Sequence, residues 1–539
     1  MKNLRKLMAL LLVCCLVLAA FAACAPKADE PADKPADQPA DSDKPADGDA
    51  PAGDAQYKDT IVIGDNGEPK NLDPDTSWGA VEARVSCFIH EGLVREDGDG
   101  NIVPLLATDW TVSDDGLVYT FNLKEGVKFS DGTDVKVSDW AWSLYRARDN
   151  EESNSRSVAA NIATVEGSDE DHTLVITLSK TDAAFLANLC KWNMVVKSEA
   201  HFNEVGKDGF LRDPLGTGPY ALVEWQQGQY IKFVANEYYH VEGKPETKNL
   251  LWKVITDDNT RLLQLQSHDI DIMGVVPTNM MSTVEADETL VANVFDGSQI
   301  RFLVFNCADK VVGDPLVREA LELAMNKQAI VDMVAGGYAV PVDTYVNTLH
   351  GDLCNTDIKV TQDIAKAKQL LADAGYPNGV EITMNTSAGN AIYENIATIL
   401  QAQWAEIGVT LKIEPLESAT LVSNLGAAAF QTTLLQWTDS TPDPNDISAY
   451  NCKYSDSYQW YSHVEDKEID AAYLATATET DHAKRVELFW ELQDLVAARR
   501  NIIPLFAQSW TYGYGANVEG IDVTPFNKVN VADIRILAD

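Results

Sequence analysis

One stretch of the sequence, residues 381–413, restricts the fold more than any other. It opens with residues 381–385, which have the composition of a short strand. Apolar residues then recur every three or four positions, as in a helix that ends at Gly408: Ile392, Ile396, Ile399, Leu400, Trp404 and Ile407. Alternation returns at Val409, Leu411 and Ile413 as a second strand. A strand, a helix and a strand in this order predict a βαβ unit, and therefore an α/β fold with parallel strands covered by helices.

The remainder of the body alternates between strands and helices in the same way. A proline after an acidic N-cap predicts a helix from Asp314, and a second helix is expected to begin at Asp363. A long amphipathic helix is expected at residues 481–499. Further strands are expected at four places: residues 60–64, 119–123, 174–178 and 432–436. A chain of 539 residues has room for several domains, so we expect at least two lobes.

The N-terminus is typical of a bacterial lipoprotein signal. A basic start containing Lys2 and Arg5 precedes an apolar run over residues 7–20, and Ala22-Ala23-Cys24 follows. The thiol of Cys24 would carry the lipid, so residues 1–23 are predicted to be a signal peptide. A plain cleaved signal and an uncleaved anchor helix are the alternatives, and Phe21 departs from the usual leucine.

Residues 24–56 begin with this cysteine and continue as a low-complexity segment rich in proline, alanine and aspartate. Such a composition buries no apolar area that could offset the entropy of ordering, so we expect a disordered acidic tether. Together with the lipid on Cys24, the tether predicts a body held on the outer side of the cytoplasmic membrane. No later segment is apolar for long enough to span a bilayer.

Charge and cysteine content exclude several classes of function. The chain has 42 lysines and arginines against 82 aspartates and glutamates, and its net charge of -40 argues against a protein that binds the nucleic-acid backbone. Five cysteines follow Cys24 without a C-x-x-C pair, so neither a disulfide framework nor a zinc site is predicted. The eight histidines form no H-x-H or H-x-x-x-H pair, and we expect neither a metal site nor a cofactor.

Motifs for catalysis are also missing from the sequence. His90-Glu91 begins like the helix of a zinc protease, but Val94 stands where the second histidine would be needed. There is no G-x-S-x-G nucleophile motif. A secreted hydrolase is therefore the weaker alternative, and no enzymatic activity is predicted.

Six blocks of the sequence carry a resemblance to a known family. The first reads PLLATDWTVSDDGLVYTFNLKEGVKFSDGTDVKVSD at residues 104–139. The others are PLGTGPY at 214–220, DPLVREALELAMNKQAI at 314–330, residues 363–375, QWAEIGVTLKI at 403–413 and WTDSTPDPN at 437–445. In this order they resemble the extracellular solute-binding proteins of the oligopeptide and dipeptide group, known as family 5, which serve ABC importers. The resemblance covers nearly all of residues 57–539.

The resemblance implies a periplasmic-binding-protein-like body of two main lobes joined by a hinge, plus an extra domain. Lobe I would be discontinuous, made of residues 57–93, 214–296 and 505–539. The extra domain would be residues 94–213, and lobe II residues 297–504. The ligand would be enclosed between the two main lobes when the hinge closes.

The same resemblance implies the ligand and the partners. A monomeric protein would capture short peptides and deliver them to the transmembrane permease subunits of an ABC importer. Other members of the wider group take oligosaccharides or metal chelates of the nickel or haem type, and these remain alternative ligands.

The segment after the strand at 432–436 is the expected centre of the ligand site, because ligands of such sheets lie beyond the carboxyl ends of strands. Trp437, Thr438, Asp439 and Ser440 stand there. In peptide-binding relatives an aspartate three residues after the tryptophan pairs with the peptide amine; here that position is Ser440, and Asp439 precedes it. Asp439 is thus either the amine partner, shifted by one residue, or a residue that caps its loop.

Three more positions are candidates through the resemblance. Trp78 and Gly79 follow the first strand, where relatives touch ligand, and Tyr461 matches a position near the peptide backbone. For each aromatic residue, plain packing in the protein is the alternative.

Overall fold

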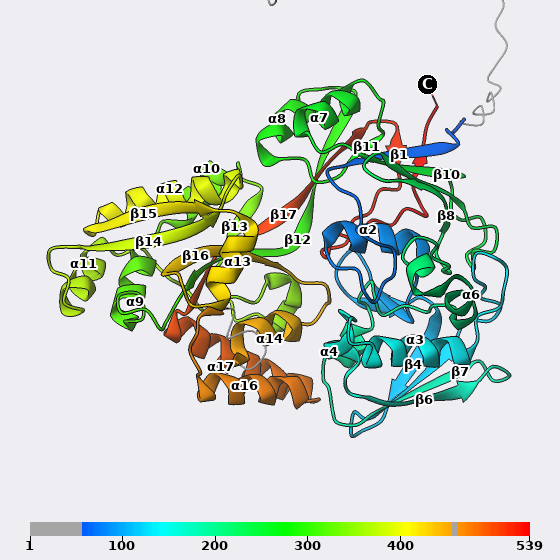
Figure 1. Cartoon of the computed structure of the whole chain (residues 1–539), viewed down its shortest axis with the longest axis horizontal. Coiled ribbons are helices and arrows are strands. Elements are labelled where there is room, and N and C mark those ends of the chain that lie inside the picture. The colour runs from blue at the N-terminus through cyan, green and yellow to red at the C-terminus, as the bar shows by residue number, and fades with distance from the viewer. Residues whose placement is uncertain (1–55, 455–460, 539) are drawn as a thin grey trace, which may run out of the picture. The chain divides into compact units, whose positions relative to one another are not determined.

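The computed structural model describes residues 56–454 and 461–538 (Figure 1). The predicted signal peptide, Cys24 and all but the last residue of the predicted tether lie outside this part of the chain. Residues 55–539 form one compact unit. No helix within the described residues is long and apolar enough to cross a membrane.

One mixed sheet runs through both predicted main lobes. Along its path, strands far apart in sequence become neighbours. From one edge to the other they are β15 (Val409–Leu416), β14 (Val380–Ser387), β16 (Thr432–Thr438), β12 (Leu290–Phe305), β17 (Ile502–Gly515), β11 (Ile272–Met273), β1 (Thr60–Asp65), β10 (Asn249–Val254), β9 (Tyr230–Ala235) and β8 (Tyr220–Gln226), while β13 (Ala339–Pro341) pairs with β17.

The predicted βαβ unit is confirmed. Strands β14 and β15 are parallel from Val380 opposite Val409 to Ser387 opposite Leu416, and α12 (Ala391–Ala405) connects them. Burial of its apolar stripe explains why this segment is a helix here: Ile396, Leu400 and Trp404 are fully buried in one core with strand residues. The indole of Trp404 also donates a hydrogen bond of 3.1 Å to the Leu321 carbonyl.

Capping residues begin the other helices of this lobe where the sequence predicts. Asp314 accepts a hydrogen bond from the Leu316 backbone at the start of α9 (Pro315–Leu323), and Asp363 accepts one from Lys366 at the start of α11 (Ile364–Asp373). Among the described residues, the remaining helices of the lobe are α10 (Lys327–Val334), the 3₁₀ helix η2 (Thr348–Leu353), α13 (Ser418–Gly426), α14 (Asn445–Cys452), α16 (Lys467–Thr478) and α17 (His482–Arg499).

The N-terminal half of the body has two further cores. Helix α2 (Ala80–Ile89) packs on β1, β9 and β10 through Val85, Phe88 and Ile89. A separate four-stranded antiparallel sheet lies within the predicted extra domain. Its strand order is β4 (Ala107–Val112), β5 (Val118–Leu123), β7 (Thr173–Leu178) and β6 (Ile162–Ser168), and its helices are α3 (Val137–Asp149), α4 (Arg156–Ala159), α5 (Phe185–Asn188) and α6 (Glu199–Phe210). Elsewhere lie β2 (Val94–Glu96), β3 (Ile102–Pro104), α7 (Asp258–Gln266), η1 (Thr278–Met280), α8 (Met281–Glu285), β18 (Val518–Glu519) and β19 (Arg535–Ile536).

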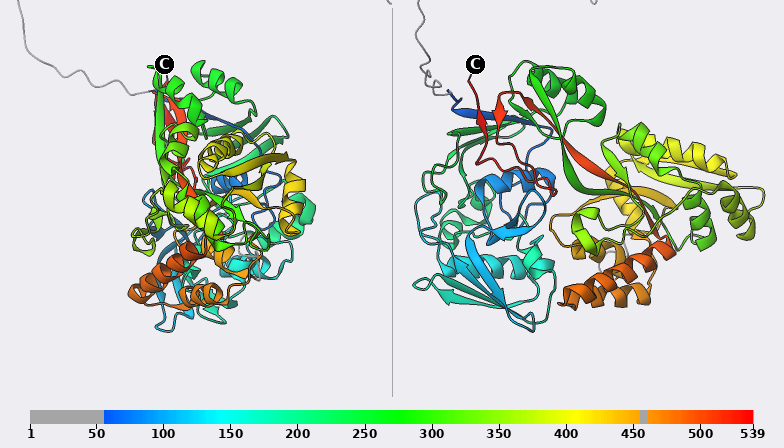
Figure 2. Two further views of the ribbon diagram at one scale, coloured as in Figure 1. Left: turned by 90° about the vertical axis from the view of Figure 1, so that its left-hand side faces the viewer. Right: turned by 180° about the vertical axis from the view of Figure 1, so that it is seen from behind.

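Two long antiparallel strands, β12 and β17, cross the boundaries expected between the main lobes at 296/297 and 504/505 (Figure 2). They pair from Leu290 opposite Gly515 to Val304 opposite Ile502, and the register shifts between Phe295 and Gln299. Gly297 lies at this irregularity, where a Cβ atom would be 2.0 Å from the Gln508 carbonyl oxygen, so only glycine fits without movement of the backbone. The two lobes are thus connected by paired strands.

Candidate ligand-binding site

Residues 437–446, here called the candidate ligand loop, begin with the last two residues of β16, Trp437 and Thr438, at the place where the sequence predicts the ligand. Trp437 is half-buried and its ring stacks on Tyr450, with centroids 3.9 Å apart. The Thr438 hydroxyl accepts a hydrogen bond of 3.0 Å from Gln299 on the neighbouring strand. Ser440 is half-buried. An aromatic wall and a hydroxyl therefore stand together at the strand end, a combination suited to a peptide or another polar ligand.

The carboxylate of Asp439 is held inside the protein. The residue is 1% exposed; one oxygen lies 2.9 Å from Nε2 of His350, and the other accepts a hydrogen bond of 3.2 Å from the Trp437 indole. Nδ1 of His350 faces the Pro442 carbonyl at 3.1 Å. Because both ring nitrogens face acceptors, His350 is assigned as an imidazolium. Burial opposes this charge, but Asp439 and the Pro442 carbonyl outweigh it and raise the His350 pKa.

These contacts bear on both interpretations of Asp439. A ligand ammonium group could approach the carboxylate only by competing with His350 or Trp437 for it. Asp439 holds the Trp437 indole through the hydrogen bond that it accepts. Its pairing with a peptide amine stays a prediction.

A second buried ion pair holds the far end of the loop. Asp443 receives two hydrogen bonds from the guanidinium of Arg485 on α17, and it also accepts one from the Asn445 backbone at the start of α14. The two charged side chains are 9% and 8% exposed. Asp443 therefore serves as a turn and helix-start residue and as the counter-ion of Arg485, and it helps to fix the loop that carries Trp437.

Trp78 and Gly79 lie on the loop between β1 and α2. Trp78 is 53% exposed, so it is available as a pocket wall, and Gly79 has a φ of 136°, which favours glycine. None of the hydrogen bonds or ring contacts found among the described residues joins Trp78 to the loop at 437–446.

The loop that carries Trp78 is supported by buried charges from the predicted extra domain. The Asp73 carboxylate lies 2.6 Å from the Arg146 guanidinium, and Asp75 lies 2.6 Å from Lys197 and also contacts Arg146. Arg146 holds the pKa of Asp73 below its usual range although burial works in the opposite direction. Asn154 donates a hydrogen bond of 3.0 Å to the Ser77 carbonyl. These contacts fix the backbone that presents Trp78.

Tyr461 is half-buried and packs against the same core as Trp437, so the structure brings these two predicted residues to one lobe. Its φ of 63° is unusual for a tyrosine. The residues that directly precede it, 455–460, lie outside the described part of the chain.

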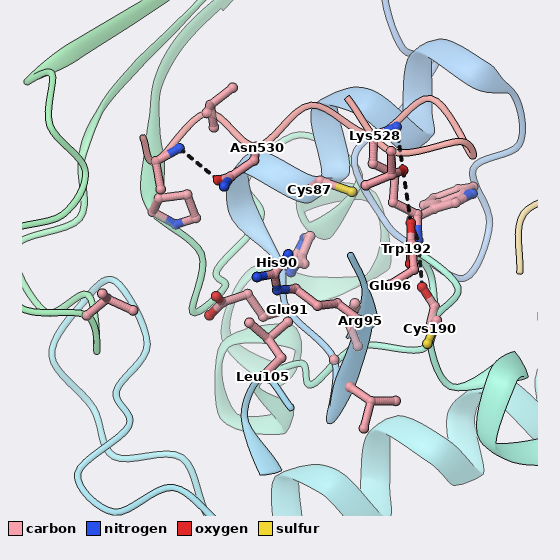
Figure 3. Close-up of a pocket in the computed structure, with 18 of the residues that line it drawn as sticks. Cys87, His90, Glu91, Arg95, Glu96, Leu105, Cys190, Trp192, Lys528 and Asn530 are labelled. Atoms are coloured by element: carbon pink, nitrogen blue, oxygen red, sulfur yellow. Dashed lines mark hydrogen bonds and ion pairs between the residues drawn. The ribbon is translucent and has the colours of Figure 1, made fainter. Parts of the chain in front are cut away.

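Two cavities within the described part of the chain are well formed, and none of the predicted ligand residues lines either. One, of about 400 Å³, lies beside β13 and β17 and is lined in part by Gly297 and Gln508. The other, of about 330 Å³, lies between α2, β2 and the C-terminal segment (Figure 3). There Lys528 lies 2.7 Å from both the Glu96 carboxylate and the Cys190 carbonyl oxygen.

Two side chains of the second cavity, the half-buried Cys87 and the buried His90, are uncharged. Burial raises the pKa of the Cys87 thiol to about 12 and lowers that of His90 to about 3, so both groups are neutral at neutral pH. Within the described residues no three metal-ligating side chains cluster at any point. Among the described residues no disulfide joins the five cysteines, and three of them are buried: Cys190, Cys354 and Cys452.

Comparison with known proteins decides the family. Residues 101–459 match the family described as bacterial extracellular solute-binding proteins, family 5 Middle. The chain belongs to this family. Family 5 members are substrate-binding proteins of ABC importers and not enzymes, which agrees with the missing catalytic motifs.

Individual relatives of this family 5 protein agree with the fold. The glutathione-binding protein GsiB of Salmonella typhimurium is 29% identical over 485 residues, which are 87% of this chain and 92% of that protein. The structure of AgaA from A. tumefaciens R10, in complex with agropinic acid, is 25% identical with a TM-score of 0.75, covering 89% and 99% of the two chains. DppA from Helicobacter pylori, in complex with the peptide STSA, is 23% identical with a TM-score of 0.76 over 89% and 99%. The predicted α/β two-lobe class is confirmed.

Two residues near the site were not found from the sequence. His350, 89 residues before its partner Asp439, looks like one of several scattered histidines. Arg301 leaves a signal that could have been read: it is the single charge within QIRFLVF, a run otherwise typical of a buried strand.

Proposed function

We propose that this family 5 protein captures short peptides between its two lobes, as a monomer, and delivers them to the permease subunits of an ABC importer. The observation that carries the proposal is the carboxyl end of β16, where Trp437 lies and where two buried ion pairs hold the residues that follow. The relative named as a glutathione-binding protein supports a peptide ligand, because glutathione is a tripeptide. Trp78, Gly79, Thr438, Asp439, Ser440 and Tyr461 are the other proposed contacts.

Native mass spectrometry of the purified protein tests the ligand class directly. A co-purified peptide would support the proposal, and an oligosaccharide or a metal chelate at the same occupancy would contradict it. Where the protein is obtained empty, calorimetry with di-, tri- and tetrapeptide pools gives the same answer.

Ligand binding is expected to close the lobes and to stabilise the fold. At a ligand concentration of 100 times Kd, the gain in the free energy of unfolding is about 2.7 kcal/mol, which raises the melting temperature. The radius of gyration from X-ray scattering should decrease at the same ligand concentration, since a ligand between Trp78 and Trp437 is buried only if the lobes approach each other. A raised melting temperature with an unchanged radius would argue against hinge closure.

The proposal includes a lipid anchor on Cys24, which holds the protein on the outer side of the cytoplasmic membrane. We expect Cys24→Ser to abolish metabolic labelling with palmitate and to move the protein from the membrane fraction to the medium, because the serine hydroxyl cannot form the thioether. A Cys87→Ser variant is the matched control and should stay labelled. Membrane attachment of Cys24→Ser would show that an uncleaved helix holds the protein instead.

A further inference from the structure

Arg301, in lobe II, is buried and, among the described residues, hydrogen-bonds only to side-chain amides. Arg301 on β12 is 4% exposed, and the hydrogen bonds of its guanidinium all go to the neutral side-chain amides of Gln299, Gln436 and Gln508. The rings of Tyr393 and Phe506 lie 5.6 and 5.8 Å from the guanidinium carbon. Burial lowers the pKa of Arg301.

The other buried arginines of the described chain show how unusual this arrangement is. Three of them pair with carboxylates: Arg84 with Asp65, Arg261 with Asp258 and Arg485 with Asp443. Arg318 instead donates to three backbone carbonyl oxygens, at residues 312, 313 and 499, which are fixed acceptors. Arg301 alone relies on side-chain amides that can rotate away. Since a buried cation is costly unless it is paired, a partner from outside the protein would resolve the imbalance.

The position of Arg301 makes such a partner reachable. In the sheet, Arg301 is opposite Gln436, the residue directly before Trp437. Tyr393, whose ring faces the guanidinium, belongs to the first turn of α12, at the carboxyl edge of β14. Gln436 is exposed, and Gln299 and Gln508 are half-buried, so one layer of amide groups separates the guanidinium from solvent. Rotation of Gln436 would uncover the guanidinium on the sheet face that also carries Thr438, whereas Trp437 points to the other face.

We propose that Arg301 is a specificity-determining residue that binds a carboxylate of the ligand. Until the ligand binds, the side-chain amides of Gln299, Gln436 and Gln508 hydrogen-bond the guanidinium and keep it in position. The proposal rests on the proposed function in that it places this subsite in the same ligand cleft. A guanidinium offers two parallel N–H donors to a carboxylate, and the ligand oxygens would take over the positions of the amide oxygens. An ionised carboxylate also compensates the charge, which three amides cannot do.

The test compares tripeptide pools with free C-terminal carboxylates and the same pools as C-terminal amides, by calorimetry. The wild type should bind the free acids about 10- to 100-fold more tightly, the range expected for loss of a hydrogen bond to a charged group. Arg301→Gln should lose this preference and bind the amides as the wild type does. Arg301→Lys should keep part of the preference. Arg212→Gln, which removes an arginine stacked on Trp225 in lobe I, is the matched control and should keep all of it.

A purely structural role for Arg301 predicts a different pattern. In that case Arg301→Gln should lower the affinity for acids and amides equally and should lower the melting temperature. If Arg301 is an uncompensated buried charge, its removal should instead leave the melting temperature unchanged or raise it. Equal binding of acids and amides by the wild type would overturn the carboxylate subsite and leave the proposed function intact.

Binding of non-peptide acids would distinguish a failure of the proposed peptide function from a failure of the carboxylate subsite. Succinate, citrate and glucuronate serve as probes when no peptide binds. If one of them binds the wild type and not Arg301→Gln, the peptide proposal fails and the carboxylate subsite stands. If only neutral sugars bind, or if a co-purified ligand without a carboxylate is retained equally by the wild type and Arg301→Gln, the assignment of Arg301 is overturned.

Discussion

Arg485→Met is expected to lower the free energy of unfolding by about 3–5 kcal/mol, because it leaves the carboxylate of Asp443 buried without its counter-ion. The guanidinium also donates a hydrogen bond of 2.9 Å to the Thr476 carbonyl, so the variant leaves this internal acceptor without its donor as well. Urea denaturation followed by circular dichroism measures the change. The loop that carries Trp437 should loosen as well, which would weaken ligand binding beyond the loss of stability.

A surface pair provides the control for this prediction. Arg535 and Glu519 are 2.6 Å apart, but their side chains are 41% and 40% exposed, so Arg535→Met should cost at most about 1 kcal/mol. The double variant Arg485→Met with Asp443→Asn also removes the unpaired carboxylate charge, so it should recover part of the lost free energy of unfolding. Equal losses for Arg485→Met and Arg535→Met would contradict the argument from burial.

The second large effect concerns the peptide amine. If Asp439 pairs with it, Asp439→Asn should reduce the affinity for free peptides by about 2–5 kcal/mol, since a buried ammonium group would lose its charged partner. N-acetylated peptides lack this charge, so they should bind the wild type poorly, and the variant should discriminate less between the free and acetylated forms. Calorimetry on both protein forms with both ligand forms gives the four affinities required.

The structure supplies the competing outcome. If Asp439 serves only to hold Trp437 and His350, Asp439→Asn should lower the affinity for free and acetylated peptides by the same factor, because the variant disturbs the loop and no ligand charge is involved. His350→Gln is the matched control: it disturbs the loop through the same hydrogen bond and leaves the Asp439 charge in place. Equal affinity of the wild type for free and acetylated peptides would place the amine elsewhere.

Local sequence signals were sufficient for most elements of the fold. Asp314 caps the helix that follows it, and Pro315 already has the φ angle that the first helical turn requires. The apolar residues around Trp404 lie on one side of a helix, and they are buried when that side packs on the two parallel strands. Both depend on residues within a few turns of each other. The position of the 437–446 loop follows from the strand before it, which is again a local property.

The chemistry of the site depends on distant residues and was therefore harder to predict. The sequence shows Asp439 as an acid in a polar loop, but its burial is set by His350, from a separate 3₁₀ helix. The expected lobe boundary at 296/297 falls on an Asp-Gly pair, which is typical of turns, yet the chain continues there as a bulged strand. Pairing with β17, some 200 residues later, decides that outcome.

The order of the central sheet has a consequence for how the body is assembled. β1 is among the first strands of the described chain, and β11 connects it to β17, which ends at Gly515. The N-terminal sheet therefore cannot be completed until almost the whole polypeptide has emerged, whereas the extra-domain sheet of β4 to β7 draws only on nearby residues. Because non-local strand pairing is slow, the extra-domain sheet would fold first in a nascent or translocating chain, and lobe I would fold only after its last strands have emerged. A chain truncated before residue 502 would leave an unpaired sheet edge that is prone to aggregation.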